Sequence, residues 1–355
     1  MEGRQNRSLK AARAWPRLKP FRPHPLLRQA DLMTVAAAFW SRKYPNLPAA
    51  VDRLFVVEPG SQILGKCHWQ PDPDHHPTMV LVHGLEGSAE SGYMLGLADR
   101  AFAAGFNAIR LNQRNCGGTA SLTPTLYNSG LSGDYRAVLR ELTERDQLPE
   151  IFFAGYSMGG NLVLKMDGEL GSTAPDALRG VCAVCCALDL AGCVDATDLP
   201  RNTFYRRYFV SKLKRRFRSK VAQFPERYSN AGLDRVRSIR DFDDVITAPN
   251  CGYQNGADYY YRASALRVTS EIRVPTLLIV AEDDPMIPPQ AFSDPTITAN
   301  PHILVVLAKH GGHCAFISAD PAERHWAEAR VVEFCATHSK LLPVQPARSG
   351  ENPAR

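Results

Sequence analysis

Residues 151–159 read Ile-Phe-Phe-Ala-Gly-Tyr-Ser-Met-Gly and mark a passage from strand to helix. The apolar run Ile151–Ala154 is typical of a buried strand, and the residues that follow Gly159 have helical character. Glycines on either side of Ser157 remove Cβ atoms that would collide in so sharp a turn, so the serine can take a strained conformation. We therefore expect the Ser157 hydroxyl to project clear of a sheet, as a nucleophile does at a strand-to-helix elbow.

Strands and helices alternate on both sides of this elbow. The expected strands are 53–57, 61–67, Thr78–Val82, Asn107–Leu111, Ile151–Ala154, Val181–Ala187, Thr276–Ala281 and Ile303–Leu307. The expected helices are Tyr93–Ala104, Asp134–Asp146 and Ala322–Phe334. This alternation predicts an α/β fold with a doubly wound, mostly parallel sheet covered on both faces.

One long stretch interrupts the alternation. Residues Asp189–Glu271 separate two core strands and carry aromatic and basic clusters in place of a strand pattern. We expect one domain over 21–342 with a helical lid insertion at about 189–271. A flexible basic arm, 1–20, and a flexible tail, 343–355, are expected to flank it.

The positive charge of the chain is unevenly distributed. The 355 residues have a net charge of +6, with basic blocks in the first 20 residues and between Arg206 and Lys220. Without a recognised nucleic-acid-binding module, these blocks predict no specific nucleic-acid partner. No run approaches the roughly 20 apolar residues that cross a bilayer, and the N-terminus lacks the apolar core of a secretion signal. We expect a cytoplasmic protein, and the sequence does not indicate its oligomeric state.

The cysteines are expected to be reduced. Their number, nine, is odd, and Cys182, Cys185 and Cys186 lie within an apolar stretch. Cys182 and Cys185 have the spacing of a redox pair or of half a zinc site, but no second pair stands at ligand spacing. We therefore expect core thiols, no bound metal and no cofactor.

A serine hydroxyl is a weak nucleophile at neutral pH, so it needs a base and a carboxylate that orients the base. The strand Thr276–Ala281 is followed by Glu282-Asp283-Asp284-Pro285, and the strand Ile303–Leu307 leads to Lys309-His310-Gly311-Gly312-His313. Both groups follow the carboxyl ends of strands, where open α/β sheets place their chemistry.

Two choices arise within these groups. Asp284 is the predicted acid because Pro285 restricts it to an extended conformation, with Asp283 kept as the alternative. His313 is the predicted base because the glycine pair before it lets the chain turn sharply, whereas His310 follows the strand directly and has a structural role.

The oxyanion of an acyl-transfer reaction needs two backbone N–H donors. In this kind of fold one follows the nucleophile and the other lies in the loop after the third strand, which predicts Met158 and Leu85. His83 precedes that loop and is expected to orient it by hydrogen bonding.

Together with the elbow, His83-Gly84-Leu85, Asp284-Pro285 and Gly312-His313, further motifs make the chain resemble the YheT-like branch of the α/β-hydrolases over roughly residues 20–340. These motifs are Arg114-Asn115-Cys116-Gly117-Gly118, Thr123-Pro124 with Tyr127 and Gly130, Asp134, Asp258-Tyr259-Tyr260 with Ser264, and Phe21-Arg22-Pro23 with Leu27 and Thr34. Many relatives read Arg-Gly directly where this chain has Arg114-Asn115-Cys116-Gly117, which reshapes the rim of the expected pocket. The membrane-spanning segment of the animal members is not carried over.

The resemblance implies a carboxylesterase or lipase-like activity, with Ser157, Asp284 and His313 as catalytic residues, Leu85 and Met158 as the oxyanion hole, and a small-molecule ester or lipid as substrate. Acyl transfer or cleavage of an amide or thioester on the same residues remains an alternative. A binding protein that has kept the fold without turnover is the non-enzymatic alternative.

The segment from Phe204 to Lys220 has near-helical spacing of aromatic residues. Basic residues fill the remaining positions: Arg206, Arg207, Lys212, Lys214, Arg215, Arg216 and Lys220. We expect its aromatic face to pack on the core with the charges in water. The alternative is that this helix makes peripheral contact with anionic lipid headgroups.

Overall fold

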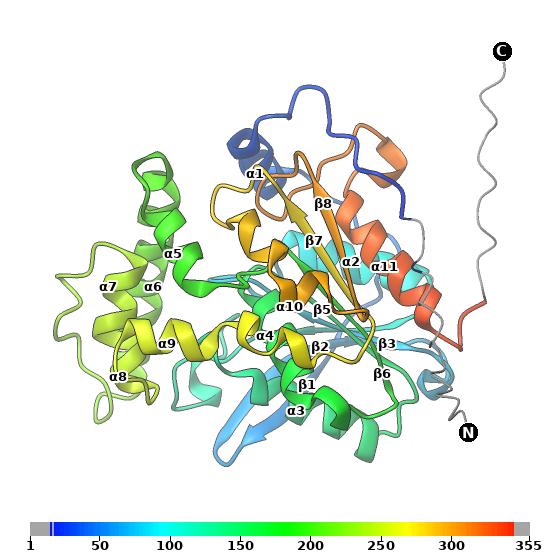
Figure 1. Cartoon of the computed structure of the whole chain (residues 1–355). Helices are drawn as coiled ribbons and strands as arrows, with labels where there is room; N and C mark the ends of the chain where they lie inside the picture. Colours follow the sequence, from blue (N-terminus) through cyan, green and yellow to red (C-terminus); the bar gives the residue numbers. More distant parts are fainter. Residues whose placement is uncertain (1–14, 16–17, 344–355) are drawn as a thin grey trace, which may run out of the picture.

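The computed structural model describes residues 15 and 18–343. Its eight-stranded sheet has the order β1-β2-β4-β3-β5-β6-β7-β8 (Figure 1). The strands are β1 (Val51–Glu58), β2 (Ser61–His68), β3 (Thr78–Val82), β4 (Asn107–Leu111), β5 (Ile151–Tyr156), β6 (Leu178–Val184), β7 (Thr276–Ala281) and β8 (Ile303–Ala308). Every neighbouring pair from β4 to β8 is parallel, whereas β1 and β2 form an antiparallel hairpin. The predicted mostly parallel α/β sheet is therefore confirmed.

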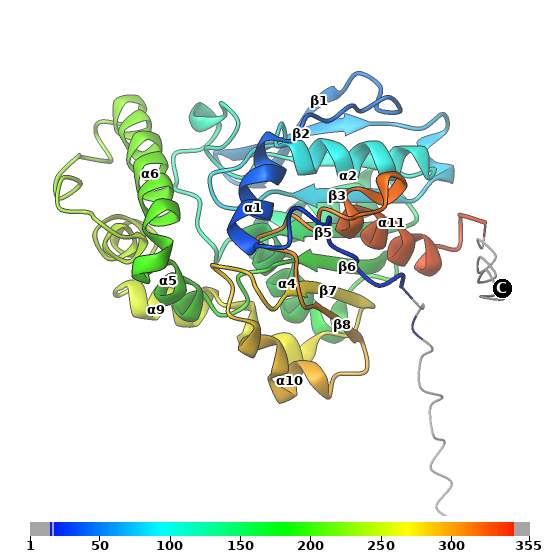
Figure 2. The same cartoon turned by 90° about the horizontal axis from the view of Figure 1, so that it is seen from above.

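Helices cover both faces of the sheet (Figure 2). On one face lie α2 (Gly92–Ala103) and α11 (Trp326–His338), which also touch each other. On the other lie α3 (Ser132–Arg140), α4 (Met158–Leu170) and the short α10 (Pro295–Thr298). All residues of β3, β4, β5 and β7 are buried, which explains why these strands are continuous apolar runs in the sequence.

The largest differences from the predicted boundaries lie in β6, α3 and α11. β6 ends at Val184 and not at Ala187, because Cys185 has a left-handed φ of 44° and leaves the sheet. α3 ends at Arg140, and a π-helical turn, Glu141–Arg145, completes the expected helix. α11 begins at Trp326 because a 3-10 turn precedes it.

The stretch between β6 and β7 is helical, as expected. It contains α5 (Leu190–Asp198), α6 (Thr203–Gln223), α7 (Ile239–Phe242), α8 (Ala248–Asn250) and α9 (Gly256–Ala263). These helices gather at one side of the sheet, at the left of Figure 1. We refer to residues 189–271 as the insertion.

The N-terminal part of the chain packs on its C-terminal part. An unexpected helix, α1 (Ala30–Phe39), buries Met33 with Ala315 and Ile317. Most of the predicted arm, 1–20, lies outside the described residues, but Trp15 stacks on Phe334 of α11 with ring centroids 6.0 Å apart. The packed domain therefore starts before residue 21, and the predicted tail lies outside the described residues beyond Pro343.

Candidate active site

Ser157 sits in a strained turn between β5 and α4. Its φ of 52° and ψ of −118° lie outside the regions that L-residues favour. A Cβ on Gly155 would come within 2.3 Å of the Gly159 carbonyl oxygen, and a Cβ on Gly159 within 2.4 Å of the Val82 carbonyl oxygen. Both glycines are therefore required for β5, α4 and β3 to approach this closely.

The structure brings Ser157, His313 and Asp284 together from the ends of three strands. His313 Nε2 lies 3.1 Å from Ser157 Oγ, and His313 Nδ1 lies 2.9 Å from Asp284 Oδ2. The other oxygen of Asp284 accepts backbone N–H bonds from Met286 at 2.9 Å and Ile287 at 3.1 Å. The carboxylate is thus held from behind while it faces the imidazole.

The neighbouring pair, His310 and Asp283, stabilises the backbone of the loop that leads to His313. Asp283 Oδ1 accepts the backbone N–H of Gly312 at 3.0 Å, and its Oδ2 lies 3.3 Å from His310 Nδ1. Neither side chain faces Ser157 through a hydrogen bond in the described structure. Of the two candidate acids, the geometry places Asp284 beside His313.

Neighbouring charged groups change the pKa of His313. Burial lowers the pKa of the imidazole, but the Asp284 carboxylate, followed by Cys314, outweighs burial and raises the pKa well above its usual value. An imidazolium formed here is therefore stabilised, which is the property needed in a base that receives a proton from serine.

Leu85 and Met158 lie next to Ser157 at the lining of one pocket. Among the described residues, neither backbone N–H donates a hydrogen bond to the protein, so both can serve an oxyanion. The preceding Gly84 N–H is fixed by the Tyr93 hydroxyl at 3.0 Å. A Cβ on Gly84 would stand 3.1 Å from the Ser157 Cβ, so glycine lets this loop approach Ser157.

His83 holds the loop that carries Leu85 through hydrogen bonds. It is buried, its Nδ1 donates to the Gly84 carbonyl at 2.8 Å, and its Nε2 accepts the Gln113 N–H at 3.1 Å. Burial lowers the pKa of His83 to about 4, so the ring is neutral and both bonds persist at neutral pH. The expected orienting role agrees with these contacts.

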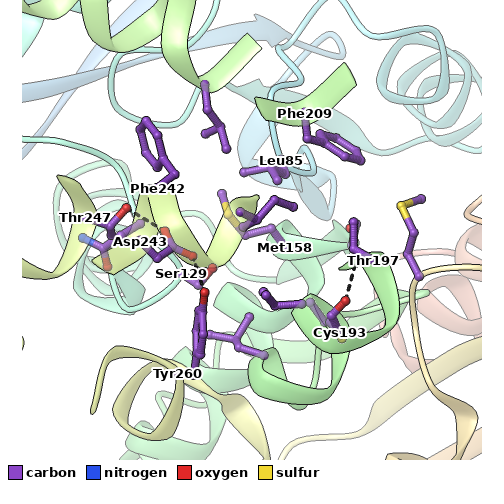
Figure 3. A pocket seen from close by; sticks show the side chains of 18 of the residues that line it. Leu85, Ser129, Met158, Cys193, Thr197, Phe209, Phe242, Asp243, Thr247 and Tyr260 are labelled. Carbon is purple, nitrogen blue, oxygen red and sulfur yellow. Dashed lines mark hydrogen bonds between the residues drawn. The ribbon is translucent and has the colours of Figure 1, made fainter. Parts of the chain in front are cut away.

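The pocket beside Ser157 has a volume of about 110 Å³. Apolar side chains dominate its walls, and the insertion supplies Val194, Phe209 and Phe242. Figure 3 shows a polar end, where the buried Asp243 accepts hydrogen bonds from the hydroxyls of Thr247 at 2.7 Å and Tyr260 at 2.8 Å. Burial raises the pKa of Asp243 to about 7.

Two basic residues of α6 point inward, contrary to the expectation that its charges lie in water. Arg216 forms a two-pronged ion pair with Glu86, in the loop after β3, with N–O distances of 2.8 and 3.0 Å. Lys220 is 1% exposed and donates to Asn115 Oδ1 at 2.7 Å and to the Ala120 carbonyl at 2.9 Å. The reason is that the loops after β3 and β4 place oxygen acceptors at the inner face of α6.

The sequence did not predict the roles of residues whose partners lie far away along the chain. Glu86 and Arg216 are 130 positions apart, and no local pattern links them. Thr34, noted only for the family resemblance, accepts the backbone N–H of His313 at 2.9 Å through its hydroxyl. Arg114 is structural, because its guanidinium is bound by Asp134 at 2.5 and 2.7 Å.

A family model described as the alpha/beta hydrolase fold matches residues 77–320. The chain belongs to the α/β-hydrolase family. YheT of Escherichia coli K12, a candidate esterase by name, is 32% identical to this hydrolase over 276 residues, which cover 76% of this chain and 80% of that protein. The resemblance to the YheT-like branch is thus confirmed. The mouse phospholipase ABHD3 is 29% identical over 69% of this chain and 60% of that protein.

Solved structures agree on the fold of this α/β-hydrolase. The Pyrococcus furiosus esterase Pf2001 superposes with a TM-score of 0.54 at 16% identity, covering 89% of this chain and 98% of that one. Within residues 15 and 18–343, no helix is both long and apolar enough to cross a membrane.

Proposed function

We propose that this chain is a serine hydrolase that cleaves carboxylic esters of acyl or lipid-like compounds. The observation that carries the proposal is the continuous hydrogen-bonded relay from Ser157 through His313 to Asp284. A chain that has kept its fold only for binding has no need of this relay. The esterase and phospholipase names of its relatives support the same class of substrate.

In this mechanism the Ser157 oxygen attacks the ester carbonyl while His313 Nε2 takes its proton. Asp284 keeps the imidazole in the tautomer that accepts at Nε2 and stabilises the imidazolium. The N–H groups of Leu85 and Met158 bind the oxyanion of the tetrahedral intermediate. His313 then protonates the leaving alcohol, and a water molecule activated by the same imidazole releases the acid from the serine.

The apolar lining of the pocket supports an apolar acyl group as the part of the substrate that it binds. Leu85, Met158 and Met286 lie at its walls together with the aromatic residues of the insertion. Because the insertion supplies several of these walls, its position sets the length of acyl chain that the pocket accepts.

The decisive experiment is labelling with a fluorophosphonate probe, which reacts only with an activated serine. We expect the full chain to be labelled and Ser157→Ala to be unlabelled, with p-nitrophenyl esters of increasing chain length then giving the preferred acyl size. Labelling of both proteins, or of neither while both are folded, would contradict the proposal. Product analysis with added alcohols would show whether acyl transfer competes with hydrolysis.

We also propose that an anionic lipid surface is the place where this hydrolase meets its substrates. The outer face of α6 exposes Phe204 at 68% and Tyr208 at 46%, with the exposed Arg207 and Arg215 between and beyond them. Exposed aromatic side chains flanked by cations suit the interface of an anionic bilayer.

The helix α1 extends this surface. It exposes Leu32 at 50% and Phe39 at 84%, and the hydroxyl of Tyr205 on α6 donates to Asp31 Oδ1 of α1 at 2.9 Å. Flotation with vesicles of anionic lipid should recover the full chain at low salt and much less at high salt. Neutral vesicles are the control, and binding that ignores both charge and salt would overturn this second proposal.

A further inference from the structure

A cluster of soft ligands stands behind the predicted base. One ligand atom each from Cys185, His313 and Cys314 lies within 4.8 Å of the other two. Among the described residues this is the group of three that has the spacing of a metal site. The sequence does not reveal it, because Cys185 and Cys314 are 129 positions apart.

Both thiols are fixed by the backbone of strand-end loops. Cys185 follows β6 with a φ of 44°, and Cys314 follows the His313 loop with a φ of 58°. The backbone N–H of Cys314 points to Cys185 Sγ at 3.3 Å, and Cys314 Sγ lies 3.6 Å from the Val184 carbonyl oxygen. Strained conformations at two neighbouring cysteines are typical of sites where side chains must converge.

We propose that Cys185, Cys314 and His313 form a binding site for Zn²⁺ or a similar thiophilic divalent cation. Two thiolates and one imidazole are a ligand set that zinc uses in proteins, with a fourth position left for water. Tetrahedral zinc with Zn–S of about 2.3 Å and Zn–N of about 2.0 Å sets its ligands roughly 3.5 to 3.8 Å apart. Zinc binding therefore requires the ligand atoms to draw together by about 1 Å from separations of up to 4.8 Å.

Occupancy of this site inhibits the hydrolase, a consequence that rests on the proposed function. A cation held by a ring nitrogen of His313 takes a lone pair or displaces the proton that faces Asp284. The imidazole then cannot both accept the Ser157 proton and keep its bond to the carboxylate. Cation and catalytic proton exclude each other, so inhibition is reversible when a chelator removes the cation.

The test uses the full chain and Cd²⁺, whose bond to thiolate gives an ultraviolet charge-transfer band. We expect one Cd²⁺ per chain with the band of two thiolates, and binding at least about 100-fold weaker in Cys185→Ala and Cys314→Ala, since even outer partners of a bound metal cost 10- to 100-fold. Cys335→Ala is the matched control, because Cys335 Sγ lies 3.7 Å from Cys182 Sγ in a thiol pair for which no histidine ligand is found. No band in the folded wild type, or an equal band in all variants, would overturn the site.

Turnover gives the second readout. Zn²⁺ should inhibit wild type and Cys335→Ala, and EDTA should restore both, whereas Cys185→Ala and Cys314→Ala, each compared with its own metal-free rate, should lose little of that rate at the same Zn²⁺ concentration. Equal inhibition of all four proteins would overturn the inhibitory role. Ser157→Ala separates the two proposals, because it should lack turnover yet keep the full Cd²⁺ band.

Discussion

Two histidine–aspartate pairs stand side by side at the ends of β7 and β8, and they differ in burial and in what they face. In the inner pair, the side chains of His313 and Asp284 are 14% and 0% exposed, and the ring reaches Ser157. In the outer pair, those of His310 and Asp283 are 33% and 23% exposed, and the carboxylate supports the loop backbone. The same two residue types thus have different surroundings, because one pair is enclosed beside Ser157 and the other is partly exposed to solvent.

The largest effect should separate these pairs in activity. We expect His313→Ala and Asp284→Asn to lower kcat/KM by about 10⁴-fold, since loss of the base or of its orienting acid removes proton transfer. His310→Ala and Asp283→Asn should retain most activity, and their losses should accompany lower thermal stability. Steady-state kinetics on a p-nitrophenyl ester measures all four, and equal losses in both pairs would erase the distinction.

A buried carboxylate outside the two pairs, Glu86, should affect stability and leave proton transfer unchanged. Its side chain is 4% exposed and that of Arg216 is 20% exposed, so Glu86→Gln should lower the free energy of unfolding by about 3 kcal/mol, the low end for breaking a buried pair. Arg145→Ala, whose side chain is 75% exposed beside Glu141, should cost less than about 1 kcal/mol. Denaturant unfolding compares them, and equal costs would show that the insertion is not held by this ion pair.

The pH dependence should report the inner pair alone. Since the pKa of His313 is raised and the base must be neutral to act, kcat/KM should rise with pH through a midpoint above the usual histidine value of about 6.5. Removing the Asp284 charge should move that midpoint to lower pH, because the imidazolium loses its main stabilisation. The His310→Ala variant should keep the wild-type midpoint; a midpoint that follows His310 would contradict the assignment.

The smallest effect should come from Thr34, which acts through the backbone of the inner pair. Thr34→Val removes the acceptor of the His313 N–H, and one hydrogen bond of about 1 kcal/mol corresponds to a loss in kcat of about fivefold. Thr34→Ser keeps the hydroxyl and should recover most of the rate. A KM change without a kcat change would place Thr34 outside the positioning of His313.

The sheet and the strand-end residues were predictable because their signals are local. Buried parallel strands are apolar runs, and Ser157, Asp284 and His313 each follow such a run within a few residues. Cys185 shows the limit, since an apolar residue just after a strand cannot reveal that its φ turns positive. Arg216 and Lys220 could not be interpreted from helical spacing either, because their acceptors belong to loops about 100 or more positions away.

The packing of α1 and Trp15 against residues after β8 sets an order of assembly during synthesis. Ser157 leaves the ribosome well before His313. The loop that carries His313 then packs on Met33 and Thr34, which were synthesised near the start of translation. Under the proposed function, an unfinished chain therefore displays the Ser157 elbow without His313, and hydrolysis begins only when β8 and α11 have packed near α1.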